Sequence, residues 1–185
     1  MRLIIIPLLT LSIYAQASEN DKNSASIVSQ VMKNAYYSGF CQALESLEAF
    51  DRTQDDLVSN NFLADFLTEG AIRSEIPDGK LVSACKAARQ KHKAFSDFFL
   101  SKGGKLEMQF IDFMERSYRA GYCKIALSLN KFAKRSDNEN QVQYAEAFSD
   151  TKLGEVLNEK DKKSYKTVCA AYILKYAKDQ SELGV

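Results

Sequence analysis

Apolar residues along the first part of the chain recur at the spacing of an α-helix. Between Ile27 and Phe50 they fall every three to five residues and form one apolar stripe, made of Ile27, Val31, Ala35, Phe40, Leu44, Leu47 and Phe50. This pattern predicts a helix from about Ser26 to Phe50, with Ser24 or Ser26 as its N-cap. No stretch of useful length alternates between apolar and polar residues, so no sheet is expected.

The same spacing predicts further helices, and Gly and Pro residues mark the breaks between them. A second helix is expected from Asp55 or Asp56 to about Thr68, ending before Gly70, and it would bury Leu57, Phe62, Phe66 and Leu63. A third, after Pro77 and Gly79, carries Leu81, Val82, Cys85, Ala88 and Phe95 and ends near Leu100, ahead of Gly103 and Gly104. Three more are expected over residues 105–132, 138–148 and 161–178. The fold class predicted is all-α.

The chain also resembles itself when it is shifted by 82 residues. The pattern Tyr36-x-x-Gly39-x-Cys41 returns as Tyr118-x-x-Gly121-x-Cys123. The match extends to Met32 with Met114, Ser46 with Ser128, Leu47 with Leu129, Phe50 with Phe132, Phe62 with Tyr144 and Phe66 with Phe148. We therefore predict a helical bundle of two tandem copies of a three-helix, one-disulfide unit, with one continuous core.

Each predicted unit has one early and one late cysteine. Four cysteines allow three pairings, and only one of these keeps each bond inside a unit. The expected disulfides are Cys41 with Cys85 and Cys123 with Cys169. Each would add on the order of 4 kcal/mol in the chain-entropy model.

Gly39 and Gly121 fall in the middle of predicted helices, where glycine costs roughly 1 kcal/mol relative to alanine. Two interpretations of these positions compete. One is the close approach of a facing helix, with Tyr36 or Tyr118 one turn away, and it is favoured. The other is a contact between the backbone and a ligand.

The beginning of the chain is typical of a secretory signal peptide. A basic start at Arg2 precedes a stretch of about a dozen mostly apolar residues, which ends in Ala15-Gln16-Ala17. The stretch falls short of the roughly 20 residues that cross a bilayer, so cleavage after Ala17 is favoured over a membrane anchor, and no stable membrane insertion is expected. The expected organisation is a signal peptide over 1–17 and units over 18–102 and 103–185, in the periplasm or secreted, where cysteines pair.

Composition and charge exclude several classes of function. The chain is 45% apolar and 26% charged, which is typical of a folded protein, and without Arg2 its Lys plus Arg and Asp plus Glu both number 24. This balance gives no reason to expect nucleic-acid binding. No metal-ligand spacing, nucleophile motif or phosphate-binding loop is present. We predict a non-enzymatic protein with no cofactor and no metal site.

The single histidine, His92, lies in a basic stretch that should disfavour protonation of its ring. A solvated helix face is the favoured interpretation, and a catalytic base is the other. Acidic residues gather near the end of the first helix, among them Glu45, Glu48 and Asp51, and basic Lys86, Arg89 and Lys93 share one face of the third. The acidic residues are expected to form a solvated face or a partner-binding surface, and segregated acidic and basic patches are suited to steering a protein partner.

In layout, the chain resembles the small periplasmic immunity proteins that neutralise peptidoglycan amidases delivered by type VI secretion. The resemblance rests on Gly39-x-Cys41 with Cys85, on Gly121-x-Cys123 with Cys169, and on the helical frame. The chain is also similar in size and cysteine spacing to the acid-stress chaperones of the periplasm. These likenesses imply binding of another protein in the bacterial envelope, as an inhibitor or as an assembly or chaperone factor.

Two other functions are alternatives to protein binding. The first alternative is a carrier of a small apolar ligand between the two units, suggested by aromatic residues near their junction: Phe95, Phe98, Phe99, Phe110 and Phe113. Core packing is the favoured interpretation of these residues. The second is an enzyme that uses His92.

Overall fold

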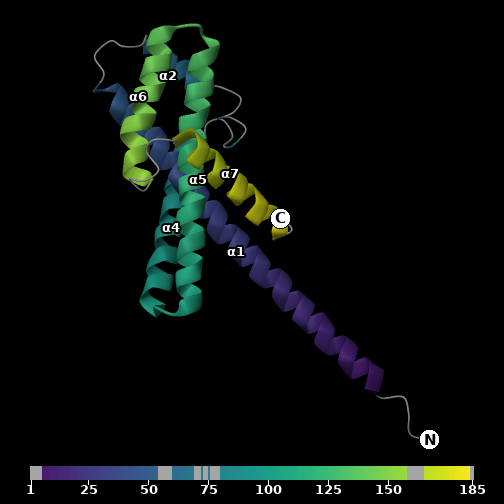
Figure 1. Ribbon diagram of the computed structural model, residues 1–185. Helices are drawn as coiled ribbons and strands as arrows, with labels where there is room; N and C mark the ends of the chain where they lie inside the picture. The colour runs from purple at the N-terminus through teal and green to yellow at the C-terminus, as the bar shows by residue number, and fades with distance from the viewer. Residues whose placement is uncertain are drawn as a thin grey trace, which may run out of the picture.

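The computed structural model describes residues 6–53, 60–68, 72, 75, 80–157 and 165–183, with side chains placed for all of them except 6–24, 60 and 106. These ranges hold helices and no strand, so the fold is all-α as predicted. The helices, shown in Figure 1, are α1 (Ile6–Asp51), α2 (Asn60–Leu67), α4 (Leu81–Lys102), α5 (Lys105–Arg135), α6 (Glu139–Val156) and α7 (Tyr165–Glu182).

Helix α1 begins far earlier than the apolar stripe predicted. It runs without a break from Ile6, so Ser24 and Ser26 lie inside it, and the prediction that one of them caps it is wrong. The cause is that no Gly or Pro interrupts residues 8–38, while Pro7 is tolerated in the first turn. The N-terminal part of α1 projects beyond the other helices (Figure 1). The predicted starts of the second helix, Asp55 and Asp56, lie outside the described residues.

Helices α1 and α5 form the central pair of the bundle and cross at the two mid-helix glycines. A Cβ atom added to Gly39 would lie 1.9 Å from the carbonyl oxygen of Tyr118, and one added to Gly121 would lie 1.9 Å from that of Tyr36. Facing backbone thus occupies the space at both positions. The interpretation of these glycines as sites of close helix approach is correct.

Each of the two disulfides joins a central helix to a peripheral one. Cys41–Cys85 links α1 to α4 with a Cα–Cα distance of 5.5 Å, and Cys123–Cys169 links α5 to α7 with a distance of 5.0 Å. This is the pairing predicted. Each bond joins two cysteines of one predicted unit, so neither disulfide connects the first predicted unit to the second.

Aromatic rings pack reciprocally across the same crossing. Tyr36 of α1 stacks on Tyr176 of α7, with ring centroids 4.5 Å apart, and Tyr118 of α5 stacks on His92 of α4 at 5.7 Å. His92 and Tyr176 both stand seven residues after the late cysteine of their part of the chain. Corresponding positions of α4 and α7 therefore each stack on a tyrosine of a central helix.

The larger cluster of buried side chains draws on both predicted units, from Phe40 and Leu47 in α1 to Phe148 in α6. A smaller cluster near the α4–α5 turn contains Val31, Ala35, Phe99, Ile111 and Met114, with Phe95 and Phe110 packed against it. Core packing therefore accounts for most of the aromatic residues near the predicted junction. Phe98 is different, because 54% of it is exposed.

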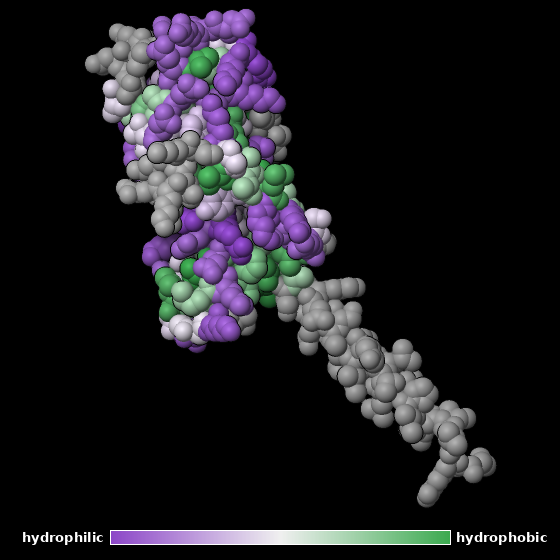
Figure 2. All heavy atoms as spheres, in the orientation of Figure 1, coloured by the Kyte–Doolittle hydropathy of each residue, from purple (hydrophilic) through white to green (hydrophobic). Residues whose placement is uncertain are grey.

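The surface changes in character along the bundle. Figure 2 shows a mostly hydrophilic end where α5 leads into α6, and apolar side chains mixed with hydrophilic ones toward the α4–α5 turn. The exposed apolar residues of that end include Phe98, Leu100 and Met108.

Candidate binding groove between α1 and α4

An open groove of about 390 Å³ lies between α1 and α4, beside the Cys41–Cys85 disulfide. Helix α1 contributes Glu45 and Glu48, which are one turn apart, and α4 contributes Lys86 and Arg89 with the same spacing. The apolar part of the lining includes Leu44, Leu81, Val82 and the disulfide itself. The disulfide holds the two helices at this point and so fixes the position of both charged rows.

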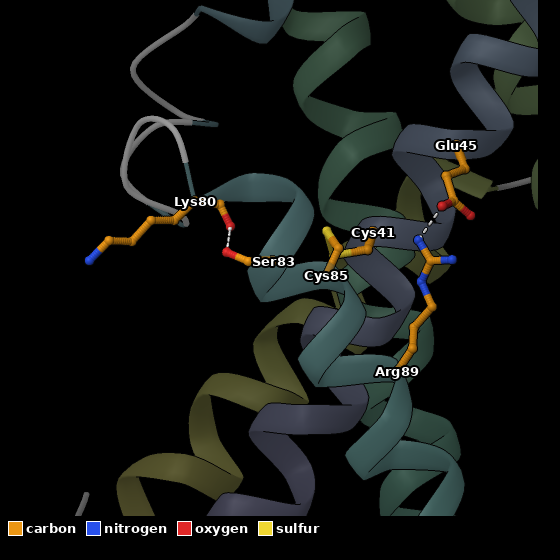
Figure 3. The surroundings of a disulfide bond; sticks show 6 residues. All are labelled: Cys41, Glu45, Lys80, Ser83, Cys85 and Arg89. Carbon is orange, nitrogen blue, oxygen red and sulfur yellow. Dashed lines mark hydrogen bonds and ion pairs between the residues drawn. A yellow bond between two sulfur atoms is a disulfide. The ribbon is translucent and has the colours of Figure 1, made fainter.

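One pair of charges already meets across the groove. Arg89 reaches from α4 to the carboxylate of Glu45 on α1, and Figure 3 shows this ion pair next to the disulfide. The side chain of Arg89 is 36% exposed and that of Glu45 is 50% exposed. A pair this exposed contributes about 0–1 kcal/mol to folding. The contribution of this ion pair to folding stability is therefore too small to explain why charged residues occupy these positions.

The remaining pair of charges is unsatisfied. Within the described part of the chain, neither Glu48 nor Lys86 has an ion-pair partner, and both are exposed. The groove therefore presents one free carboxylate on its α1 side and one free ammonium on its α4 side.

The expectation of segregated acidic and basic patches is wrong in two respects. Four of the six residues, Glu45, Glu48, Lys86 and Arg89, come together in one groove, because α1 and α4 pack side by side. The other two do not line it. The carboxylate of Asp51 accepts a hydrogen bond from the hydroxyl of Tyr144 at 3.0 Å, and Lys93 pairs with Asp97 at 2.9 Å.

Val82, one of the apolar residues that the expected third helix carries, is 83% exposed and borders the groove. The spacing offered a clue, since Leu81, Cys85 and Ala88 already complete the buried face and Val82 stands one position off it.

The four charged positions of this groove have uncharged counterparts beside Cys123–Cys169. Counted from the cysteines, the positions of Glu45, Glu48, Lys86 and Arg89 are occupied there by Leu127, Asn130, Ala170 and Ile173. The helices that carry them still pack and still form a disulfide. A helix pair of this kind thus folds without the four charges.

A tyrosine bridges the helices on that second side. Tyr165 stands four residues before Cys169, as Leu81 stands four before Cys85. Its hydroxyl donates to the side-chain oxygen of Asn130 at 3.3 Å, and its ring packs on the core. The amide of Asn130 in turn donates to the hydroxyl of Ser149 at 2.7 Å. Leu81 makes no polar bridge, which leaves the first side open.

His92 does not lie on a fully solvated helix face, so that prediction is wrong. Its ring is half-buried against Tyr118, and its Nδ1 is buried with no hydrogen-bond partner among the described residues. Burial lowers the pKa of His92, because the charged ring would lose its hydration. The predicted direction is correct, but the cause is burial and not the neighbouring lysines.

Burial also shifts the tyrosines at the centre of the bundle. It raises the pKa of Tyr122 to about 12 and raises the pKa values of Tyr36 and Tyr176 above the ordinary range of tyrosine. The pKa of Tyr144 rises through burial and through its hydrogen bond to Asp51. All four therefore remain protonated and neutral near neutral pH, and Tyr144 donates its hydroxyl proton to Asp51.

The described residues contain no group of three or more His, Cys, Asp or Glu side chains arranged to hold a metal ion. They also contain no helix with a stretch long and apolar enough to cross a membrane.

Comparison of the chain with models of protein families, with curated protein sequences and with solved structures found no match.

Proposed function

We propose that this is an exported, non-enzymatic helical protein that binds another protein of the bacterial envelope through the α1–α4 groove. The observation that carries the proposal is the contrast between the two sides of the bundle. Four charged residues line the groove, and all four counterpart positions are uncharged. Charges that the fold does not need, two of them unpaired, suit recognition. The two disulfides support an oxidising compartment.

The groove also indicates the chemistry of the partner. Carboxylates stand on its α1 side and cations on its α4 side, and apolar Leu81 and Val82 border it. A complementary segment carries a basic residue opposite Glu48, an acidic residue opposite Lys86, and an apolar side chain between them. Charged groups of this kind add more to association rate and specificity than to affinity.

The direct test is capture of envelope proteins on the immobilised, disulfide-intact protein, compared with three variants. Leu81→Tyr places in the groove the residue that occupies the counterpart position at Tyr165. Glu48→Lys reverses a free charge of the groove. Lys131→Glu, on the exposed surface of α5, serves as the control. We expect one stoichiometric protein on the wild type and on K131E, and its loss on L81Y and E48K. Equal capture by all four proteins would overturn the proposal.

Two forms of this function can be separated by acid. An inhibitor of a cell-wall enzyme, as in the immunity proteins, should stay folded at about pH 3 and bind a single target. A chaperone of the acid-stress type should loosen there and expose apolar surface, with helical content retained and tertiary packing lost. Near-UV circular dichroism at low pH measures the difference.

A further inference from the structure

A second groove lies farther along α4, beyond the α1–α4 groove, and its lining differs in character. Its volume is about 430 Å³, and it is open to solvent and bordered by residues of α4, α5 and α6. Leu100, Ile111, Met114 and Val156 supply its apolar surface, and the stacked rings of His92 and Tyr118 form part of its lining. Ser96 of α4 also lines the groove, and its side chain is small.

The counterpart of this place, between α1 and α7, is filled. Gln180 stands eleven residues after Cys169, as Ser96 stands eleven after Cys85. The Gln180 side chain accepts a hydrogen bond from the hydroxyl of Ser29 at 2.8 Å, and its amide contacts the sulfur of Met32 at 3.7 Å. Ser29 and Met32 are the counterparts of Ile111 and Met114. The fold can therefore close this site with one larger side chain, and Ser96 leaves it open.

The charged residues around the second groove are already paired. Arg119 lies 3.6 Å from the carboxylate of Glu115 and donates to the hydroxyl of Tyr172 at 3.0 Å. Glu155 pairs with Lys152 at 2.8 Å. Burial also keeps the His92 ring neutral. A charged ligand would either have to break one of these ion pairs or give up its hydration without gaining a partner of opposite charge. An uncharged ligand would not incur this desolvation cost.

We propose that the groove walled by His92 and Tyr118 is a binding site for a small, uncharged, mainly apolar molecule. The volume lies within the range of small-molecule sites, which are mostly apolar with a few polar groups. This site is distinct from the protein-binding groove, since the two share no residue.

The experiment is a fluorescence titration of the full, disulfide-intact protein with N-phenyl-1-naphthylamine, an uncharged aromatic probe. Its sulfonated derivative, which has the same frame and one negative charge, is titrated in parallel. Ser96→Gln closes the groove in the way Gln180 closes its counterpart. Ser101→Gln makes the same exchange at an exposed position of α4 outside the groove and is the matched control. Leu100→Glu, at a residue that is 56% exposed, adds a charge to the groove.

We expect saturable binding of one uncharged probe molecule, with roughly tenfold or greater loss of affinity in S96Q and L100E and none in S101Q. The sulfonated probe should bind the wild type at least about tenfold more weakly. Leu81→Tyr should not affect the probe, which separates this site from the α1–α4 groove. An absence of saturable binding, an equal affinity for both probes, or unchanged binding in folded S96Q and L100E would each overturn the proposal.

Discussion

At the scale of single residues, the two disulfides differ in how far solvent can reach them. Cys85 is 8% exposed and borders the α1–α4 groove, whereas Cys123 and Cys169 are fully buried. Reduction requires that a thiolate approach a sulfur atom, and nearby cations favour thiolates. Lys86 and Arg89 line the same groove as Cys85.

We therefore expect dithiothreitol to reduce Cys41–Cys85 before Cys123–Cys169 in the native protein. Alkylation at timed intervals, followed by peptide mass spectrometry, measures the order. The same experiment in denaturant is the control, because unfolding should make the two bonds equally accessible. Simultaneous or reversed reduction in the native state would contradict the assignment of accessibility.

His92 should make the folding stability of the protein depend on pH. Burial lowers its pKa, so the unfolded chain binds the proton more tightly than the folded one. Stability should accordingly fall as the pH decreases below about 6.5, the ordinary pKa of histidine, and stop falling below the folded pKa. Glu115, Glu155 and Arg119 line the same groove, but burial is the dominant cause.

His92→Tyr, which introduces the residue found at the counterpart position Tyr176, should remove this slope. Urea unfolding at about pH 7.5 and about pH 5.5 measures it, in a window where Asp and Glu are mostly ionised. His92 is the only histidine, so no other imidazole contributes. An equal loss of stability in the wild type and in H92Y would assign the effect to other groups.

At the scale of helices, the α1–α5 crossing depends on two positions without a Cβ atom. Gly39→Ala and Gly121→Ala each place a methyl group against a facing carbonyl, which belongs to backbone and cannot rotate away. Each should therefore cost about 2–3 kcal/mol by forcing the helices apart, even after the roughly 1 kcal/mol that alanine gains in helix propensity.

Because one separation of the helices relieves both contacts, the double variant should lose less than the sum of the two single losses. Denaturant unfolding of the three variants tests both statements. A neutral or stabilising effect of either single change would show that the helices can separate without loss of packing.

Most of the helices could be predicted from the sequence, because helix formation depends mainly on residues that are close together along the chain. The expected third helix and the second unit's helices agree with α4 to α7 to within a few residues at most ends, since Gly103, Gly104 and the apolar spacing act within one turn. The largest disagreement among these helices is at the C-terminal end of α6, which is predicted at Phe148 and lies at Val156. The disulfide pairing followed from the repeated pattern of cysteines.

The grooves could not be predicted, because they depend on which helices pack side by side. The sequence placed Glu45 and Arg89 on different helices and gave no measure of their distance. It also gave no sign that Tyr165 bridges to Asn130 while Leu81 leaves the other side open. These differences depend on how side chains of neighbouring helices contact one another. The pattern of residues along a single helix gives no information about those contacts.

At the scale of the whole molecule, one cluster of buried side chains joins α1, α2, α4, α5, α6 and α7. Because neither predicted unit buries its own share of this cluster alone, we expect a single cooperative unfolding transition. Far-UV circular dichroism and tyrosine fluorescence should give coincident midpoints in urea. Two separate midpoints would indicate that the units unfold independently.

The routes of the disulfides have a consequence for how the chain can be divided. Each bond joins two cysteines on the same side of Gly103 and Gly104 in the sequence, so only this glycine link connects the earlier part of the chain covalently to the later part. A protease site placed at this exposed turn would leave two fragments, each with its own internal bond. The fragments would then be a pair of separate subunits held together by the glycine crossing and the shared buried cluster, with an affinity that dilution can measure.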